Sequence, residues 1–283
     1  MGLTGTSLSA TGVRTVDASI RRAKRALKRM LAMCGYEAPG LKLRRRVCIG
    51  YNLIRDVKLI LGRDLYCMID GGAHFGETAL NFGDEFPDAL IFSFEPTPEA
   101  FGELRRNTRD YPHIKLINAC LGEKNGTAIL HINNDSQTNS LLDVAEESSR
   151  WVPAEVTTEK TRAEVPVYAL DDFVPDQINR PVDLLKLDVQ GYEMMVLRGA
   201  AELLARAAFP LIYLEICYVP QYRDQTSLPD LYSLLYGYGY RLVSTYPSEF
   251  DARDYKYGVG GDLLFVHESY GSTSPNHLSK KDD

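Results

Sequence analysis

Short apolar runs alternate with helical stretches through most of the chain, and this alternation constrains the fold more than any other feature. The runs are continuous in hydrophobicity, as in strands that are buried on both faces. They are predicted as strands over residues 67–70, 90–94, 114–121, 184–187, 211–216, 241–244 and 263–266. Strands that alternate with helices in this way indicate an α/β fold with a doubly wound, mostly parallel sheet.

Polar residues stand at or near the ends of five predicted strands. They are Asp70, Glu95, Asn118, Asp188 and Glu215. In an open α/β sheet, ligands bind beyond the carboxyl ends of the strands. We therefore expect these side chains to line one crevice.

The first of these strands runs into a glycine-rich loop with the sequence DGGAHFG, residues 70–76. A strand before the loop and a helix after it are the context of a nucleotide-binding turn. Asp70 would repel a pyrophosphate but could receive the ammonium group of S-adenosylmethionine, and the loop contains no Lys or Arg. This favours S-adenosylmethionine over a dinucleotide, although a tight turn without a ligand is the alternative.

Glu95 follows Asp70 by 25 residues and ends the second predicted strand. A carboxylate at this place can accept both hydroxyls of a ribose, in NAD sites as well as in S-adenosylmethionine sites. Asn118 could present its amide near an adenine edge, or could simply be a turn residue. A helix-capping or solvated acid is the alternative for Glu95.

Seven collinear blocks between residues 66 and 245 resemble the FkbM family of S-adenosylmethionine-dependent methyltransferases. The blocks are MIDGGAHFGETA (68–79), FSFEPTPEAF (92–101), INACLGEKNGTA (117–128), TNSLL (138–142), VYALDDF (167–173), LLKLDVQGYEMMVLRGA (184–200) and PLIYLEI (210–216). The resemblance implies a Rossmann-like class I methyltransferase fold with a seven-stranded sheet. It also implies O-methylation of a sugar, glycan or polyketide-type hydroxyl. The family's usual Asn is His74 here, and its usual Glu is Gln190.

The resemblance also implies which residues hold the cofactor. The methionine end would contact the loop and its flank, namely Asp70, Gly71, Gly72, Ala73, His74, Gly76 and Thr78. Glu95 with Pro96 would hold the ribose, and Asn118 with Ala119 the adenine side. Asp188 would lie near the reactive methyl group, and it could alternatively orient the ammonium group.

Methyl transfer to a hydroxyl benefits from a base that takes the proton. The candidates are Asp188, Glu193 and Glu215, and His74 is a further one. Glu193 begins a predicted helix, where the helix dipole should lower its basicity, so Asp188 is preferred. Neighbouring carboxylates could also hold Mg²⁺, but no metal is predicted.

A polar insertion, residues 135–164, separates predicted strands over residues 127–132 and 165–170. Long insertions beside an active crevice are often lids. We predict that Asn139, Ser140 and Trp151 contact the methyl acceptor. A surface excursion anchored by Trp151 is the alternative.

The net charge of −6 conceals an asymmetry along the chain. Residues 1–50 carry eleven Lys and Arg but two acids, a net +9, and the other residues sum to −15. Residues 13–34 are predicted as a basic amphipathic helix. It is interpreted as a docking helix, with a homodimer contact or a peripheral anionic membrane contact as alternatives. The acidic body disfavours nucleic-acid substrates.

These features predict three parts of the chain: a basic helical extension (1–64), a methyltransferase domain (65–268) and a polar tail (269–283). A second helix is expected over residues 45–61. Five scattered cysteines without a CxxC pair, no membrane-spanning apolar run and no apolar region of a signal peptide indicate a reduced, cytoplasmic protein. The alternatives to methyl transfer are an NAD-dependent oxidoreductase or epimerase, which lacks its Tyr-x-x-x-Lys pair here, and a non-catalytic scaffold that binds S-adenosylmethionine.

Overall fold

The computed structural model describes residues 36–37, 44–45, 49–246 and 259–271. The chain divides into two compact units, residues 1–49 and 50–283. In the first unit, β1 (Tyr36–Glu37) pairs antiparallel with β2 (Arg44–Arg45). The helix predicted over residues 13–34, and the tail beyond residue 271, lie outside the described residues.

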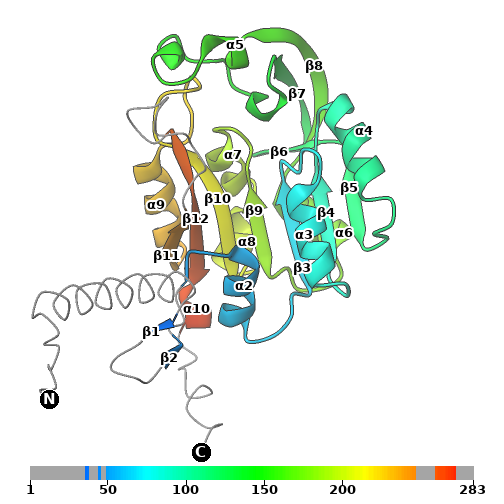
Figure 1. The fold of residues 1–283 in the computed structure, drawn as a ribbon, viewed down its shortest axis with the longest axis vertical. Helices are drawn as coiled ribbons and strands as arrows, with labels where there is room; N and C mark the ends of the chain where they lie inside the picture. The colour runs from blue at the N-terminus through cyan, green and yellow to red at the C-terminus, as the bar shows by residue number, and fades with distance from the viewer. Residues whose placement is uncertain (1–35, 38–43, 46–48, 247–258, 272–283) are drawn as a thin grey trace, which may run out of the picture. The chain divides into compact units, whose positions relative to one another are not determined.

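The second unit is built on a seven-stranded sheet (Figure 1). Its strands are β3 (Cys67–Gly71), β4 (Leu90–Phe94), β5 (Ile114–Ile117), β9 (Leu184–Leu187), β10 (Leu211–Cys217), β11 (Tyr240–Tyr246) and β12 (Gly260–His267). Their order is β11-β12-β10-β9-β3-β4-β5, and β12 runs antiparallel to both of its neighbours. This confirms the predicted doubly wound, mostly parallel sheet of the class I methyltransferase fold.

Helices cover both faces of this sheet (Figure 1). They are α2 (Leu53–Leu61), α3 (Glu77–Glu85), α4 (Pro98–Asn107), α6 (Leu170–Gln177), α7 (Glu193–Arg198), α8 (Ala201–Ala205), α9 (Leu228–Gly237) and α10 (Glu268–Gly271). Successive residues of a strand point to opposite faces, so Met68 packs in a core with Phe82 of α3 and Ile69 in another with Leu197 of α7. Two apolar layers therefore fix the carboxyl ends of the strands.

Two helices, those that begin at Leu53 and at Glu193, differ from the prediction. The helix expected over residues 45–61 begins only at Leu53, because Asn52 caps it by accepting a hydrogen bond from the Arg55 amide. This helix packs in a core of the second unit through Val57, although the sequence places it in the extension. The helix predicted to begin at Glu193 is interrupted at Gly199, where a Cβ atom would lie 2.1 Å from the Gly122 carbonyl oxygen.

A second sheet of three strands carries the polar insertion. The strand predicted over residues 114–121 is broken after Ile117, and its last part leaves the main sheet as β6 (Cys120–Leu121). β6 pairs with β8 (Glu159–Tyr168), which pairs antiparallel with β7 (Gly126–Asn133). Between β7 and β8 lie the short helices η1 (Ser136–Thr138), η2 (Ser148–Arg150) and α5 (Ala154–Thr157).

Candidate functional site

A cavity of about 280 Å³ opens at the carboxyl ends of β3, β4 and β9. Of the residues predicted from the sequence, its lining includes Gly72, Ala73, His74, Thr78, Glu95, Pro96, Ala119, Asn139, Ser140, Asp188 and Glu215. The others do not line it: Asp70, Gly71, Gly76, Asn118, Glu193 and Trp151. The volume is near the lower end of the range of small-molecule sites, about 300–1,000 Å³.

The glycine-rich loop is packed against the ends of two strands. The amides of Gly72 and Ala73 both donate to the Phe94 carbonyl oxygen at the end of β4. Gly72 has a φ of +79°, and a Cβ atom there would lie 1.8 Å from the Asp188 carbonyl oxygen. Only glycine therefore allows the loop to approach β9 this closely. His74 adopts a φ of +48°, a conformation that His and Asn tolerate better than most residues.

Glu95 is buried at the cavity wall, and the backbone holds its carboxylate in place. One oxygen accepts a hydrogen bond from the His74 amide at 2.9 Å, and the other accepts one from the Thr97 amide at 2.8 Å. Burial raises the pKa of Glu95, which the two amide hydrogen bonds partly offset. Each carboxylate oxygen can accept a second hydrogen bond, so the group could also bind the two hydroxyl groups of a ribose.

Asn118 supports this arrangement from outside the cavity. Its amide nitrogen donates to the carbonyl oxygens of Glu95 at 2.8 Å and Pro96 at 3.1 Å. The side chain therefore fixes the turn after Glu95, while its neighbour Ala119 reaches the cavity wall. We infer that Asn118 acts on the adenine side through the backbone it holds.

Asp70 has a positive partner inside the protein, which the sequence analysis missed. The Lys186 ammonium nitrogen lies 3.0 Å from an Asp70 carboxylate oxygen and donates to the Gly72 carbonyl oxygen at 2.9 Å. Both side chains are buried, and their residues face each other on β3 and β9. Burial lowers the pKa of Lys186, but the charges of Asp70 and Asp188 outweigh it and raise that pKa. A lone Lys in the apolar run LLKL was the signal that could have revealed the pair.

Asp188 and Glu215 form a linked pair of carboxyl groups at the other side of the cavity. The side-chain nitrogen of Gln190 donates to Asp188 at 2.9 Å and to Glu215 at 2.8 Å. The charge of Asp188, together with burial, raises the pKa of Glu215 to about 9. Burial acts to raise the pKa of Asp188, but the charge of Lys186 and its hydrogen bonds hold that pKa below its ordinary value. Asp188 is therefore the stronger acid of the pair and Glu215 the weaker one.

Glu193 lies outside the cavity and serves the backbone. One oxygen accepts hydrogen bonds from the amides of Gly191 at 3.1 Å and Val189 at 3.4 Å. Burial raises the pKa of Glu193 to about 7, which is opposite to the decrease expected from the helix dipole. Desolvation outweighs the dipole here because the side chain is almost fully buried.

The insertion between β7 and β8 contributes one wall of the cavity. Asn139 accepts from the Asn133 amide at 2.8 Å and donates to Thr97 Oγ1 at 3.2 Å. Ser140 donates its hydroxyl proton to the Gln190 carbonyl oxygen at 2.7 Å, and His74 contacts Ser136 Oγ at 2.8 Å. Trp151, in contrast, follows η2 away from the cavity lining.

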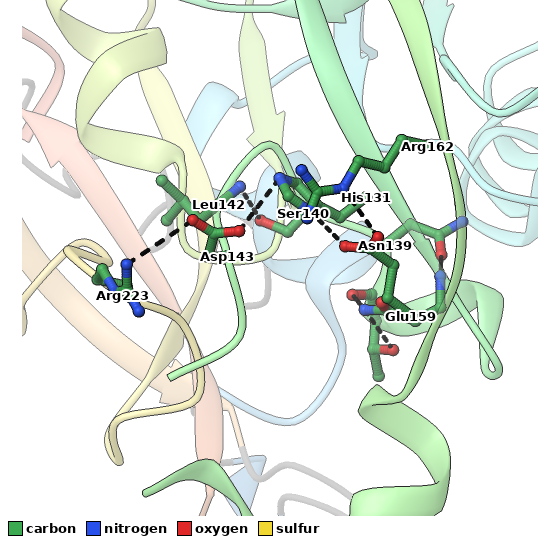
Figure 2. Close-up of polar contacts among 10 residues, drawn as sticks. His131, Asn139, Ser140, Leu142, Asp143, Glu159, Arg162 and Arg223 are labelled. Carbon is green, nitrogen blue, oxygen red and sulfur yellow. Dashed lines mark hydrogen bonds and ion pairs between the residues drawn. The ribbon is translucent and has the colours of Figure 1, made fainter. Parts of the chain in front are cut away.

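Figure 2 shows how the base of this insertion is fastened. The His131 imidazole on β7 lies between Glu159, at 2.7 Å, and Asp143, at 3.7 Å. Arg162 donates to Glu159 at 2.8 Å, and Arg223 approaches Asp143 at 3.9 Å. This network connects the insertion to β8 and to the loop after β10.

Among the residues that the structure describes, no group of three or more His, Cys, Asp or Glu side chains is arranged to bind a metal ion. No helix within this described part of the chain is both long and apolar enough to span a bilayer.

Comparison with known proteins places these residues in a family context. The model described as "Methyltransferase FkbM domain" matches residues 70–242. "2-O-methyltransferase NoeI" of Sinorhizobium fredii is 26% identical over 223 residues, which cover 74% of this chain and 83% of that protein. "Methyltransferase sdnD" of Sordaria araneosa is 30% identical over 156 residues, 48% of this chain and 60% of that protein. "Methyltransferase 1" of Beauveria bassiana is 28% identical over 142 residues, 47% of this chain and 57% of that protein.

Proposed function

The chain belongs to the FkbM methyltransferase family, whose model matches residues 70–242, and from this premise we propose that it methylates a hydroxyl group of a sugar, glycan or polyketide-type metabolite. As a member of this family, it is an S-adenosylmethionine-dependent methyltransferase. The family membership decides against the NAD-dependent oxidoreductase.

The cavity residues fit S-adenosylmethionine. When bound, this cofactor supplies an electrophilic methyl group and leaves as neutral S-adenosylhomocysteine. We assign its ribose to Glu95, whose fixed carboxylate has free acceptor positions at the cavity wall. Its methionine end belongs at Gly72, Ala73 and His74, and its adenine side at Ala119. Asp70 holds Lys186 and would act on this loop from within the sheet.

One observation carries the proposal of a hydroxyl acceptor: the Asp188 carboxyl group, 40% exposed in its side chain, lies at the cavity wall within reach of a bound acceptor. A hydroxyl must lose its proton as its oxygen is methylated, and a positioned carboxylate can take that proton. Glu215 lies beside it, and its protonated form can donate a hydrogen bond. The relative named as a 2-O-methyltransferase supports oxygen as the acceptor atom.

The acceptor itself would lie against the insertion. Asn139 and Ser140 line the same cavity as Asp188 and present polar groups from one segment. Polar groups in a small-molecule site fix orientation and provide specificity. We assign them to the acceptor side, and we no longer include Trp151 because its ring does not line the cavity.

The test is methyl transfer from isotopically labelled S-adenosylmethionine to a panel of oligosaccharides, glycolipids and hydroxylated polyketides. We expect label in an ether that withstands mild base, and its loss in Asp188→Asn. The control is Asp176→Asn, which changes an exposed aspartate of α6 and should leave the transfer intact. Label on nitrogen, or in a base-labile ester, would contradict a hydroxyl acceptor.

Two further assignments remain proposals. We propose that the protein acts in the cytoplasm. We also propose that the basic segment of residues 13–34, predicted as a helix, docks onto the protein, a second copy or an anionic membrane surface. Gel filtration and vesicle flotation, each with and without residues 1–35, distinguish these three docking partners.

A further inference from the structure

Gln190 makes contacts that cofactor binding does not require. Its side-chain nitrogen bridges Asp188 and Glu215, at 2.9 Å and 2.8 Å. We propose that Gln190 is a positioning residue that holds the Asp188 and Glu215 carboxyl groups together as a coupled pair, and that Tyr222 fixes the orientation of the Gln190 amide. The consequence for catalysis rests on the proposed role of Asp188 as base.

Tyr222 determines which end of the amide faces the carboxyl groups. Its buried hydroxyl lies 3.0 Å from Gln190 Oε1 and 3.0 Å from the Thr138 carbonyl oxygen, and it accepts a hydrogen bond from the Gln221 amide at 2.9 Å. The hydroxyl carries one proton, which it shares between these two acceptors or donates to one of them at a time. The oxygen of Gln190 faces Tyr222, and the NH₂ group faces Asp188 and Glu215.

The backbone of Gln190 is held independently of its side chain. Residue 190 has a φ of +52°, and its carbonyl oxygen accepts the Ser140 hydroxyl proton at 2.7 Å. The next residue, Gly191, has a φ of +92° and packs against Tyr222 and Gln225. A left-handed backbone is uncommon for a residue with a long side chain. It aims the Gln190 amide at the carboxyl pair.

The surrounding charges act on the two members of the pair in opposite directions. The charged groups that face it are Lys186 from β9, Asp262 opposite Glu215 on β12, Glu193 at the start of α7 and His74 from the glycine-rich loop, and the neutral Tyr213, Cys217 and Tyr222 also lie near it. Lys186 favours the ionised form of Asp188, whereas Asp262 and Glu193 disfavour a second negative charge on Glu215. Gln190 donates to both members, so it bridges them without adding charge.

The titration of the pair tests this proposal without cofactor or acceptor. Carboxyl ¹³C NMR of the whole protein from pH 4 to pH 11, with resonances assigned through Asp188→Asn and Glu215→Gln, reports each group. In the wild type we expect Asp188 to be ionised at pH 5 and Glu215 to titrate near pH 9. Gln190→Met removes the donors at similar length, and it should raise at least one of the two pKa values by about one unit, a tenfold change in proton affinity, because the ionised carboxylates lose a hydrogen bond.

Two more variants keep the test informative. Gln190→Asn retains an amide and tolerates the left-handed backbone, but it is too short to bridge, so it should titrate like Gln190→Met. Tyr222→Phe should shift the titrations in the same direction by a smaller amount. Tyr232→Phe, which changes an exposed tyrosine of α9 outside this network, is the matched control and should titrate like the wild type.

The outcomes separate this proposal from the proposed function. If folded Gln190→Met, Gln190→Asn and Tyr222→Phe all titrate like the wild type, Gln190 does not set the protonation of the pair, whatever the acceptor is. If the titrations shift but no hydroxyl is ever methylated, the positioning role stands and the proposed acceptor class fails. Should neither Gln190 variant fold, the titration of Tyr222→Phe decides alone.

Discussion

The Lys186 ammonium nitrogen lies 3.0 Å from the carboxylate of Asp70, between adjacent strands that are more than a hundred residues apart in the chain. Both side chains are buried beneath the glycine-rich loop, and Lys186 also binds the Gly72 carbonyl oxygen. A charge pair therefore joins the centre of the sheet to the glycine-rich loop, to which we assign the methionine end of the cofactor.

Removing one member of this pair should destabilise the protein strongly. Lys186→Met leaves Asp70 buried without its counter-charge, which typically costs about 3–5 kcal/mol in the free energy of unfolding. Urea denaturation measures this change. The double variant Lys186→Met with Asp70→Asn should recover much of the loss, because no uncompensated charge remains.

A surface pair provides the control for Lys186. Lys58 forms an ion pair with Glu85, and the two side chains are 38% and 46% exposed. Solvent screens such pairs, so Lys58→Met should change stability little. An equal loss in the two lysine variants would show that the Asp70–Lys186 pair has no special weight.

Glu95→Gln should weaken S-adenosylmethionine binding without unfolding the protein. An amide keeps the shape, but it loses the charge and one acceptor oxygen. A lost hydrogen bond to a charged group costs about 1.5–3 kcal/mol, or roughly tenfold to hundredfold in Kd. Isothermal titration calorimetry measures it, with the exposed Glu99→Gln as control. Wild-type affinity in Glu95→Gln would remove Glu95 from the cofactor site.

Asp188→Asn and Glu215→Gln should affect turnover differently. Loss of a general base lowers turnover by about 10²–10⁴-fold, so Asp188→Asn should reduce kcat far more than cofactor affinity. Glu215→Gln should retain most of the activity at pH 7, because a neutral amide resembles the protonated acid. An equal loss of kcat and affinity in Asp188→Asn would assign Asp188 to cofactor binding instead.

The high pKa of Glu215 also makes stability depend on pH. The unfolded chain releases this proton near pH 4.5 and the folded protein near pH 9, so between these values the folded state binds more protons. The stability that Glu215 contributes is complete below pH 4.5 and is lost as the pH rises to about 9. Thermal melts from pH 6 to pH 9 should therefore fall less steeply for Glu215→Gln than for the wild type. Parallel curves would contradict the assignment.

Gly72→Ala should disrupt the loop, since the new Cβ atom would collide with the Asp188 carbonyl carbon and oxygen. Gly62→Ala is a matched control: Gly62 also has a positive φ, +66°, but a Cβ atom there meets nothing within 4 Å. The control should cost only the backbone strain, about 1 kcal/mol. Gly72→Ala should cost more and abolish cofactor binding, as thermal melts and calorimetry would show. Similar melts for both variants would contradict this close approach.

Features that depend on local sequence were predictable. The strand before the glycine-rich loop, the position of Glu95 and the proline that begins α4 follow from short-range patterns, and the structure has each of them. Contacts across the chain were not predictable in the same way. Asp70 was assigned to the cofactor because its partner, Lys186, comes beside it only when β9 pairs with β3. Tyr222 was missed because a buried hydroxyl looks like any other tyrosine in the sequence.

The polar insertion begins and ends on two strands of one antiparallel ladder, β7 and β8, which stand apart from the main sheet. A replacement of residues 134–158 would therefore leave the pairing of these two strands in place. The new segment would have to restore the contacts that Ser136 and Ser140 make with His74 and Gln190. Swapping the segment between relatives would then be a direct route to enzymes with altered acceptor preference.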